Sequence, residues 1–224
     1  MKTVVITSQK GGTGKTTLTA HLAVAAAHDK AGRAVVIDTD PQNTLATWWN
    51  KREAETPQLA PVSVDGLEAK LDALAKSGFD YCLIDTPPAL TKQNREVLRL
   101  ANLVIIPTRP SPNDLWALGA TLDLVKESGT PFVFALTQAK GNARITVQTI
   151  AALSQHGQVF QSVIHDRVDY ATSMTDGRTA GEINPGGPAA EEIAQLWSLT
   201  KKRISELANV REPANNGKKA KAYA

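Results

Sequence analysis

The amino-acid sequence predicts an α/β fold, in which a doubly wound, mostly parallel sheet is flanked by helices. Short apolar runs rich in Val and Ile alternate with helix-length segments along the chain. Most of these runs are continuous, as expected for strands that are covered on both faces. A glycine-rich segment, residues 9–17, joins the first run to the first helical segment. Such repetition is typical of doubly wound sheets, whose ligands bind beyond the carboxyl ends of the strands.

The apolar runs define the expected strands, and the segments between them have the length of helices. The strands are Thr3–Thr7, Ala34–Asp38, Tyr81–Asp85, Leu103–Pro107 and Phe132–Leu136, with weaker ones near Val62 and Val163. The helices are Lys15–His28, Asn43–Lys51, Leu67–Lys76, Gln93–Ala101, Asn113–Ser128, Ile145–His156 and Ala189–Ala208. Functional residues are therefore expected in the loops after Thr7, Asp38, Asp85 and Pro107.

Length and composition indicate one globular domain, which we assign to residues 1–209. The chain has 224 residues, and its hydrophobic fraction of 42% excludes a disordered protein. Cys82 stands alone, which excludes a disulfide scaffold. No apolar run approaches the roughly 18 residues of a membrane span, and the start of the chain turns polar after Ile6, too soon for a signal peptide. We therefore expect a cytoplasmic protein that does not bind membranes.

Basic residues gather at the end of the chain. The net charge is +3, but the last 24 residues contain seven Lys and Arg against Glu206 and Glu212. We read residues 210–224, with their Pro, Gly and Asn, as a disordered basic tail. A basic end on a nearly neutral body indicates either a polyanion partner or a solubilising tail, and the charge count does not choose between them.

The strongest motif is QKGGTGKTT, Gln9 to Thr17. Its glycines let successive backbone N–H groups point into one concavity, to which the following helix adds its positive end. In this arrangement Lys15 reaches the β- and γ-phosphates and the Thr16 hydroxyl binds Mg²⁺. Gln9 replaces the usual first glycine, and Lys10 adds a second cation at the start of the loop. The alternative is a glycine-rich turn without function.

Three aspartates follow predicted strands. Asp85 ends an apolar strand, from which a carboxylate can hold Mg²⁺ together with Thr16. The alternative for Asp85 is a cap of the following turn. Asp38 and Asp40 are spaced by two, so both point the same way while the backbone stays extended, and they repel unless a cation lies between them. Asp40 has the alternative role of a helix cap.

The segments KGGTGKTT, VVIDTDPQ and FDYCLIDTPP, in this order, resemble the ParA family of DNA-partition ATPases, a group with a deviant Walker A motif. The resemblance covers about residues 1–208. Because the phosphate loop begins by residue 9, the chain is similar to the small, ParF-like members without an amino-terminal helix-turn-helix. Cysteines that would bind an iron–sulfur cluster are missing, so the related nitrogenase-iron-protein group is excluded.

The resemblance implies a deviant Walker A P-loop NTPase with ATP and Mg²⁺ as cofactors. Asp85 corresponds to the Walker B aspartate, Asp40 polarises or positions the attacking water, and Asp38 lies near the metal. Lys10 reaches across a homodimer to the phosphates of the partner. The expected catalytic residues are Lys10, Lys15 and Asp40, and the expected metal site is Thr16, Asp38 and Asp85. The expected nucleotide-binding residues are Lys10, Gly11, Gly12, Thr13, Gly14, Lys15, Thr16, Thr17, Pro107, Thr108, Pro110 and Asn113.

Pro107, Thr108, Pro110 and Asn113 belong to the loop PTRPSPND. In ParF-like members this loop packs beside adenine. The alternative is a rigid loop that enters a helix at Pro112. ATP is favoured over GTP because the segment LTQAKG replaces a guanine-reading Asn-Lys-x-Asp. The four histidines lack the spacing of a metal site. Trp48 and Trp49 are expected to serve packing.

The resemblance further implies slow ATP hydrolysis, an ATP-dependent dimer that binds nucleoid DNA non-specifically, and a ParB-like centromere-binding partner that stimulates hydrolysis in plasmid or chromosome partition. The candidate DNA contacts are Lys201, Lys202 and Arg203, with Arg178, Arg167 and Arg144 as weaker ones. A MinD-like membrane protein is disfavoured, because the segment ISELANVREPANNG is too polar to bury an apolar face. A positioning ATPase for another cargo and a P-loop biosynthetic ligase remain open alternatives, although such a ligase needs no cross-subunit lysine.

Overall fold

A computed structural model describes residues 1–29, 32–89, 91–141 and 143–211 of the chain. Its sheet has seven strands, all parallel, in the order β3-β2-β4-β1-β5-β6-β7. The strands are β1 Lys2–Ile6, β2 Ala34–Asp38, β3 Gln58–Leu59, β4 Tyr81–Asp85, β5 Leu103–Thr108, β6 Phe132–Ala139 and β7 Val159–His165. The predicted doubly wound α/β fold is confirmed, and the sheet is parallel throughout.

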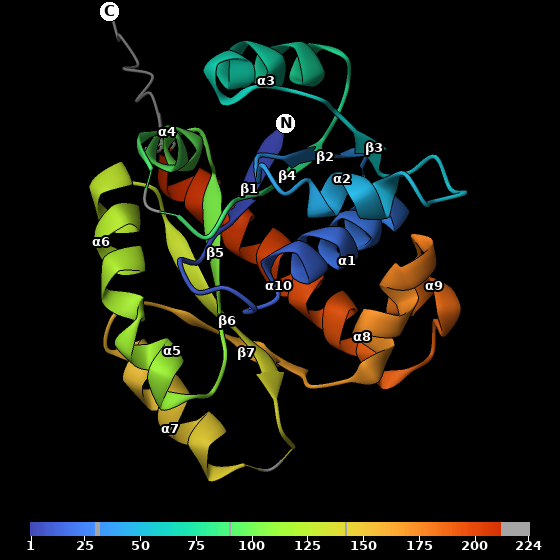
Figure 1. Cartoon of the computed structure of the whole chain (residues 1–224). Coiled ribbons are helices and arrows are strands. Elements are labelled where there is room, and N and C mark those ends of the chain that lie inside the picture. Colours follow the sequence, from blue (N-terminus) through green and yellow to red (C-terminus); the bar gives the residue numbers. More distant parts are fainter. Residues whose placement is uncertain (30–31, 90, 142, 212–224) are drawn as a thin grey trace, which may run out of the picture.

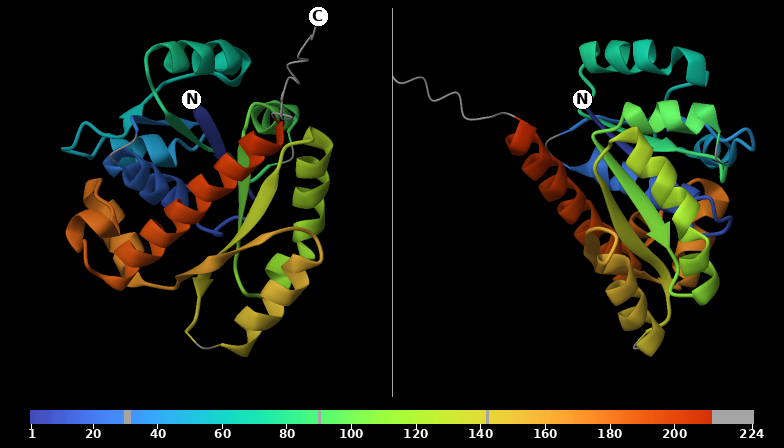
Figure 2. Two further views of the ribbon diagram at one scale, coloured as in Figure 1. Left: turned by 180° about the vertical axis from the view of Figure 1, so that it is seen from behind. Right: turned by 90° about the vertical axis from the view of Figure 1, so that its left-hand side faces the viewer.

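Helices cover both faces of the sheet (Figures 1 and 2). Successive residues of a strand point to opposite faces, so Val4 and Ile6 of β1 join one apolar cluster while Val5 joins the other. One cluster includes side chains of α1 Lys15–His28, α2 Thr44–Trp49, α8 Val168–Ser173, α9 Ala180–Ile183 and α10 Pro188–Arg211. The other includes side chains of α3 Leu67–Lys76, α4 Lys92–Arg99, α6 Leu118–Ser128 and α7 Arg144–Ser154.

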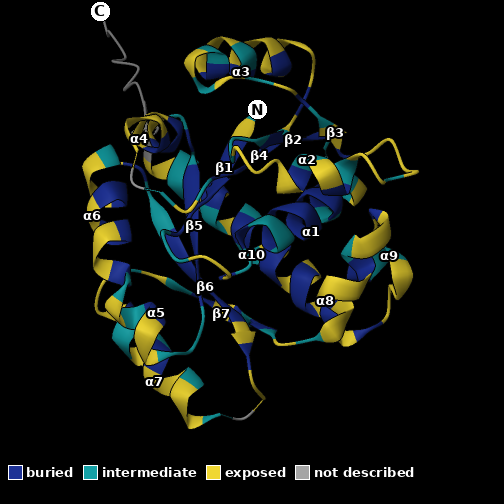
Figure 3. Ribbon diagram, viewed as in Figure 1, coloured by how far each residue is buried: buried dark blue, intermediate teal, exposed yellow. Residues whose placement is uncertain are grey.

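Most residues of helix α1 are buried, as the dark ribbon in Figure 3 shows. It packs against α10 and against β2 and β4. Ala20, Ala23 and Ala26 are fully buried, and such small side chains permit close approach of the neighbouring elements. The carboxyl end of the sheet and the start of α1 are therefore held together by one core.

Most predicted elements agree with the structure to within about two residues, but two regions differ. The segment predicted as one helix over Asn113–Ser128 forms α5 Pro112–Trp116 and α6, which separate at Ala117. Between β7 and α10, the structure contains α8, the 3₁₀ turn Met174–Asp176 and α9, none of which was predicted. A second 3₁₀ turn, Val64–Gly66, precedes α3, and the weak strand expected near Val62 is β3, a few residues earlier.

The carboxyl-terminal helix is longer than predicted. Helix α10 continues through Val210 to Arg211, so the first two residues assigned to the tail are helical. The remainder of the predicted tail, residues 212–224, lies outside the described residues. Over the part of the chain that the structure describes, no helix combines the length and the apolar character needed to cross a membrane.

Candidate nucleotide site

The phosphate loop connects β1 to α1, at the centre of the carboxyl edge of the sheet. Gly12 and Gly14 have φ angles of 75° and 85°, which an L side chain adopts only with strain. Gly14 stands immediately before α1, and its carbonyl accepts the N–H of Leu18. The two glycines therefore explain how the chain turns from the strand into the helix within this short segment.

Strand β6 holds the loop from one side. The Thr137 hydroxyl donates to the carbonyl of Thr13 at 2.8 Å, and Nε2 of Gln138 donates to the carbonyl of Gly12 at 2.7 Å. Because C=O and N–H point in opposite directions in a trans peptide, the N–H groups of Thr13 and Gly14 point away from β6. Sequence reasoning missed both β6 residues, since LTQAKG was considered only for the base-reading motif that it lacks.

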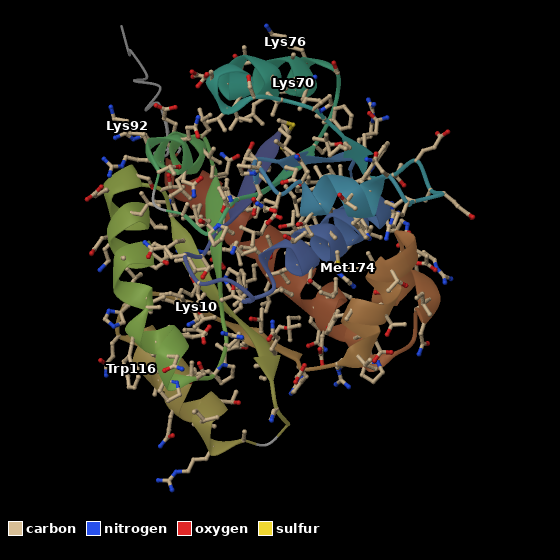
Figure 4. All side chains as sticks on the ribbon, in the orientation of Figure 1. Lys10, Lys70, Lys76, Lys92, Trp116 and Met174 are labelled. Carbon is tan, nitrogen blue, oxygen red and sulfur yellow. The ribbon has the colours of Figure 1, made fainter. Side chains whose placement is uncertain are left out.

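Lys15 and Asp85 form the buried part of the site. Nζ of Lys15 lies 3.4 Å from the carbonyl oxygen of Lys10, and the side chain is almost fully buried. Burial lowers the pKa of Lys15, against the opposing effect of the charges of Asp85 and Asp40. Figure 4 labels Lys10 on the same loop, on the side nearer to α5 and α6.

Asp85 faces the first turn of α1. Its Oδ2 accepts a hydrogen bond from the Thr16 hydroxyl at 2.5 Å, and its Oδ1 lies 3.4 Å from the Thr19 hydroxyl. The residue is 1% exposed, and burial is the main reason that its pKa rises to about 7. A buried carboxylate beside a hydroxyl is costly without a cation, and oxygens are the ligands that Mg²⁺ prefers. Thr16 and Asp85 therefore fit a magnesium ion.

Asp38 lies beside Asp85, because β2 and β4 are neighbours and these two residues are paired in register. Its Oδ1 accepts the N–H of Asp40 and its Oδ2 accepts the N–H of Ala46, both at 3.0 Å. Ala46 is in the first turn of α2, so Asp38 accepts one of the free N–H groups at the start of that helix, whose N-cap residue is Asn43. Burial raises the pKa of Asp38, while these N–H donors lower it.

Asp40 closes a turn after β2, where its Oδ1 accepts the N–H of Gln42 at 3.0 Å. The alternative considered for Asp40, a helix cap, is not what the structure shows, because Asn43 stands at the N-cap position of α2. The charge of Asp40 also acts on Lys15 and Asp85, raising the pKa of each. The structure therefore places Asp38, Asp40, Asp85 and Lys15 near one another at one edge of the sheet.

A hollow of about 170 Å³ adjoins the phosphate loop at the ends of β6 and β7. Its lining includes Gly14, Thr17, Thr137, Gln138, Asp166 and Arg167. The predicted base-binding residues are elsewhere: Pro107 and Thr108 are buried in β5, Pro110 is half-buried and Asn113 is exposed on α5. None of these four lines the hollow.

The six basic candidates for DNA contact fall into two groups. Four are paired with carboxylates: Lys201 with Asp29, Arg203 with Glu206, Arg178 with Asp176 and Arg167 with Glu192. The other two, Lys202 on α10 and Arg144 at the start of α7, are exposed and have no ion-pair partner among the described residues. Ion pairing within the chain reduces the charge that the first group offers to a polyanion.

A parallel sheet with a phosphate loop, a buried lysine and a hydroxyl–carboxylate pair at its carboxyl edge defines a P-loop nucleotide-binding protein. The model of the CobQ/CobB/MinD/ParA nucleotide binding domain matches residues 4–180, and the chain belongs to this family. The predicted relationship to ParA-type proteins is thereby confirmed.

The relatives include a carboxysome distribution protein and a chromosome-partitioning ATPase. Maintenance of carboxysome distribution protein A of Halothiobacillus neapolitanus is 26% identical over 206 residues, which cover 87% of this chain and 94% of that protein. The chromosome-partitioning ATPase Soj of Thermus thermophilus is also 26% identical, over 92% of this chain and 98% of its own length. The chain is thus similar to ParA/MinD-type positioning ATPases.

Solved structures share the fold. An ATP complex of a Cyanothece McdA variant has a TM-score of 0.68 at 22% identity and covers 95% of this chain and 98% of that chain. MinD in the MinC:MinD complex of Aquifex aeolicus has a TM-score of 0.75 at 17% identity, covering 90% and 96% of the two chains.

Proposed function

We propose that the protein is a ParA-type ATPase whose ATP-bound dimer binds DNA non-specifically and positions a cargo along it. The observation that carries this proposal is the phosphate loop, with Lys10 at its start, beside the buried Thr16–Asp85 pair. Lys10 stands at the start of the loop in addition to Lys15, which already serves the nucleotide of its own chain. When two chains meet face to face across their nucleotides, Lys10 can contribute its charge to the phosphates bound by the partner chain.

Nucleotide binding follows from the contacts of the loop. Backbone N–H groups of residues 11–16 and the Lys15 ammonium bind the phosphates, with Thr17 at the start of the helix beside them. Thr16 and Asp85 would hold Mg²⁺, with Asp38 nearby, and the ion would supply charge neutralisation for the phosphates. We assign the base to the hollow beside Gly14 and Thr17, because it adjoins the loop. The loop with Pro107, Thr108, Pro110 and Asn113 remains the second candidate.

Hydrolysis requires a water molecule in line with the terminal phosphate. In our proposal Asp40 orients this water; its oxygen bonds to the γ-phosphorus while the bond to the β–γ bridging oxygen breaks, releasing ADP and phosphate. NTPases of this kind turn over at about 10⁻⁴ to 10⁻² s⁻¹ until a partner protein stimulates them. The ATP-bound dimer is therefore long-lived, and a partner that completes the site acts as its trigger.

DNA binding follows from the dimer. One weakly basic surface binds DNA with a dissociation constant of about 10⁻⁴ to 10⁻⁶ M, and joining two such surfaces strengthens binding by about 10² to 10⁴. Lys202 and Arg144 are the preferred contacts because their charges are unpaired among the described residues. Lys201, Arg203, Arg178 and Arg167 would first have to leave their carboxylates.

Two cargoes are supported by different relatives. Similarity to Soj favours chromosome or plasmid partition with a ParB-like centromere-binding partner. The matching length and 26% identity of the Halothiobacillus carboxysome distribution protein favour a protein compartment as a second candidate. The two differ in the partner that stimulates hydrolysis, a DNA-bound protein in the first and a compartment-bound adaptor in the second.

The test combines sedimentation and DNA retardation with ATP, ADP or no nucleotide, each with Mg²⁺. We expect dimers and retarded DNA with ATP, but not with ADP or without nucleotide. In a parallel assay we expect no binding to anionic liposomes. Neutralising Lys202 and Arg144 to Ala should lower the slope of log affinity against log salt by about two to four for the dimer. Lys92→Ala, an exposed lysine on α4, is the matched control. Chains that sediment as monomers at every concentration with ATP and Mg²⁺ would overturn the proposal.

A further inference from the structure

Arg109 directly follows β5 and is held against the phosphate loop by a buried carboxylate. Its Nε donates to Oδ1 of Asp114 at 3.0 Å, and its Nη2 donates to Oδ2 at 3.1 Å. Asp114 is 4% exposed, and the Ser111 hydroxyl also donates to its Oδ2, at 2.5 Å. This two-point contact fixes the plane of the guanidinium and thereby the direction of its third nitrogen.

The third nitrogen of Arg109 lies beside the phosphate loop. A Cβ built on Gly12 would stand 3.8 Å from Nη1, so the guanidinium is in contact range of the middle of the loop. Nη1 makes no hydrogen bond to the residues that the structure describes, and the Arg109 side chain remains 31% exposed. Nη1 of Arg109, which carries two N–H groups, thus lies next to the loop and is oriented by the contacts of Nε and Nη2 with Asp114.

We propose that Arg109 is a phosphate-binding residue of the same chain, whose Nη1 donates to an oxygen of the terminal phosphate of a bound nucleoside triphosphate. The inference rests on the proposed function, since it requires a nucleotide on the loop. Asp114 is the positioning residue, because its carboxylate holds the guanidinium in place before the nucleotide arrives. Arg109 differs in this from Lys10, which is proposed to serve the partner chain.

Because Asp114 holds the guanidinium of Arg109 in place before a nucleotide binds, the contact with a phosphate needs no reorganisation of the protein. The contact also discriminates between nucleoside triphosphates and diphosphates. A diphosphate lacks the oxygens that Nη1 would reach, whereas a triphosphate gains a charge-assisted hydrogen bond. Such bonds change affinity by about 10- to 100-fold. Since Asp114 lies in α5, the contact would also couple the terminal phosphate to that helix, whose Trp116 is exposed on the surface (Figure 4).

The experiment measures affinities for ATPγS and ADP, with Mg²⁺, by calorimetry on the full chain. For Arg109→Gln we expect affinity for ATPγS to fall about 10- to 100-fold and affinity for ADP to change less than about threefold. Arg109→Lys keeps the positive charge beside Asp114 but loses the planar guanidinium and its two-point contact. It should therefore show the same selective loss of affinity for ATPγS. Arg99→Gln, an exposed arginine on α4, is the matched control.

Two further variants separate binding from folding. Asp114→Asn should reduce the ratio of ATPγS to ADP affinity, which a merely structural role would leave unchanged. The double variant Arg109→Gln with Asp114→Asn carries no unpaired buried charge, and it should retain ADP binding with the ratio still reduced. An unchanged ratio in Arg109→Gln, or equal losses for both nucleotides, would overturn the inference while leaving the proposed function intact. Wild-type chain that binds neither nucleotide would overturn both.

Discussion

Replacing Asp85 by Asn is expected to stabilise the metal-free protein at neutral and alkaline pH. The carboxyl group is 1% exposed, and its pKa rises from 3.8 to about 7 in the folded chain. Burial is the largest cause, the nearby charges of Asp38 and Asp40 add to it, and the Thr16 hydroxyl and Lys15 act in the opposite direction. The fold therefore favours the protonated form of this group.

The sign of the effect follows from proton linkage. Between about pH 4 and pH 7 the folded chain binds more protons at Asp85 than the unfolded chain does, so stability falls as pH rises through this window. Each pKa unit corresponds to about 1.36 kcal/mol, and a rise from 3.8 to about 7 therefore gives about 4 kcal/mol. Asn keeps an oxygen that can accept from the Thr16 hydroxyl, and it carries no charge.

The assay is urea unfolding from pH 4 to pH 8 in the presence of EDTA and without nucleotide. The difference in unfolding free energy between Asp85→Asn and wild type should shift by about 4 kcal/mol in favour of the variant across this range. Asp72→Asn, on the exposed face of α3, controls for charge removal alone and should give a nearly constant difference. A pH-independent difference for Asp85→Asn would refute the reasoning from burial.

Three other substitutions test separate parts of the molecule. Lys15→Ala should abolish ATP binding measured by calorimetry, because it removes the buried cation of the phosphate loop; retained tight binding would contradict that assignment. Asp40→Ala should block hydrolysis yet leave an ATP-dependent dimer in sedimentation, and a variant that stays monomeric at saturating ATP would count against its role with water. Gly177→Ala places a Cβ 2.5 Å from the backbone nitrogen of Arg52 at a φ of 83°, and should lower unfolding free energy by about 2–4 kcal/mol. Gly129→Ala, at a φ of 70° with no atom within 4 Å, should cost only about 1 kcal/mol, and equal losses would exclude the clash as the cause.

Sequence reasoning succeeded where local signals are strong. Helix α1 begins and ends at the predicted residues, because the glycines of the phosphate loop precede it and Asp29 follows it in extended conformation. The strands were recognisable because both of their faces are buried, which produces continuous apolar runs. The proximity of Thr16 to Asp85 could be predicted because linear motifs fix the places of both residues.

The missed elements depend on contacts between distant parts of the chain. Helix α9 has four residues and no periodic pattern; its first N–H group, from Ala180, donates to Nε2 of the buried His21 on α1. The separation of α5 from α6 accompanies the pairing of Asp114 with Arg109 before α5. Short helices held by tertiary contacts carry little signal in the sequence itself.

The same reason explains the residues of the site that were missed. Thr137 and Gln138 follow no motif, and their role is visible only when β6 lies beside the loop. Lys201 was a leading DNA candidate because of its charge, yet its carboxylate partner, Asp29, lies at the end of α1. A count of charges treats every exposed lysine alike, whereas the fold decides which ones remain available.

The burial of Asp85 links the stability of the chain to its proposed ligand. In the metal-free protein a proton offsets the cost of a charged carboxylate in the core, since the pKa of the group rises to about 7. A magnesium ion beside Thr16 would offset the same cost and compete with that proton. Binding of a metal-bound nucleotide would then restore the stability that the ionisation of Asp85 removes. The carboxylate buried at the end of β4 is therefore one physical cause for both the predicted loss of stability of the free chain as pH rises and the proposed binding of a metal-bound nucleotide.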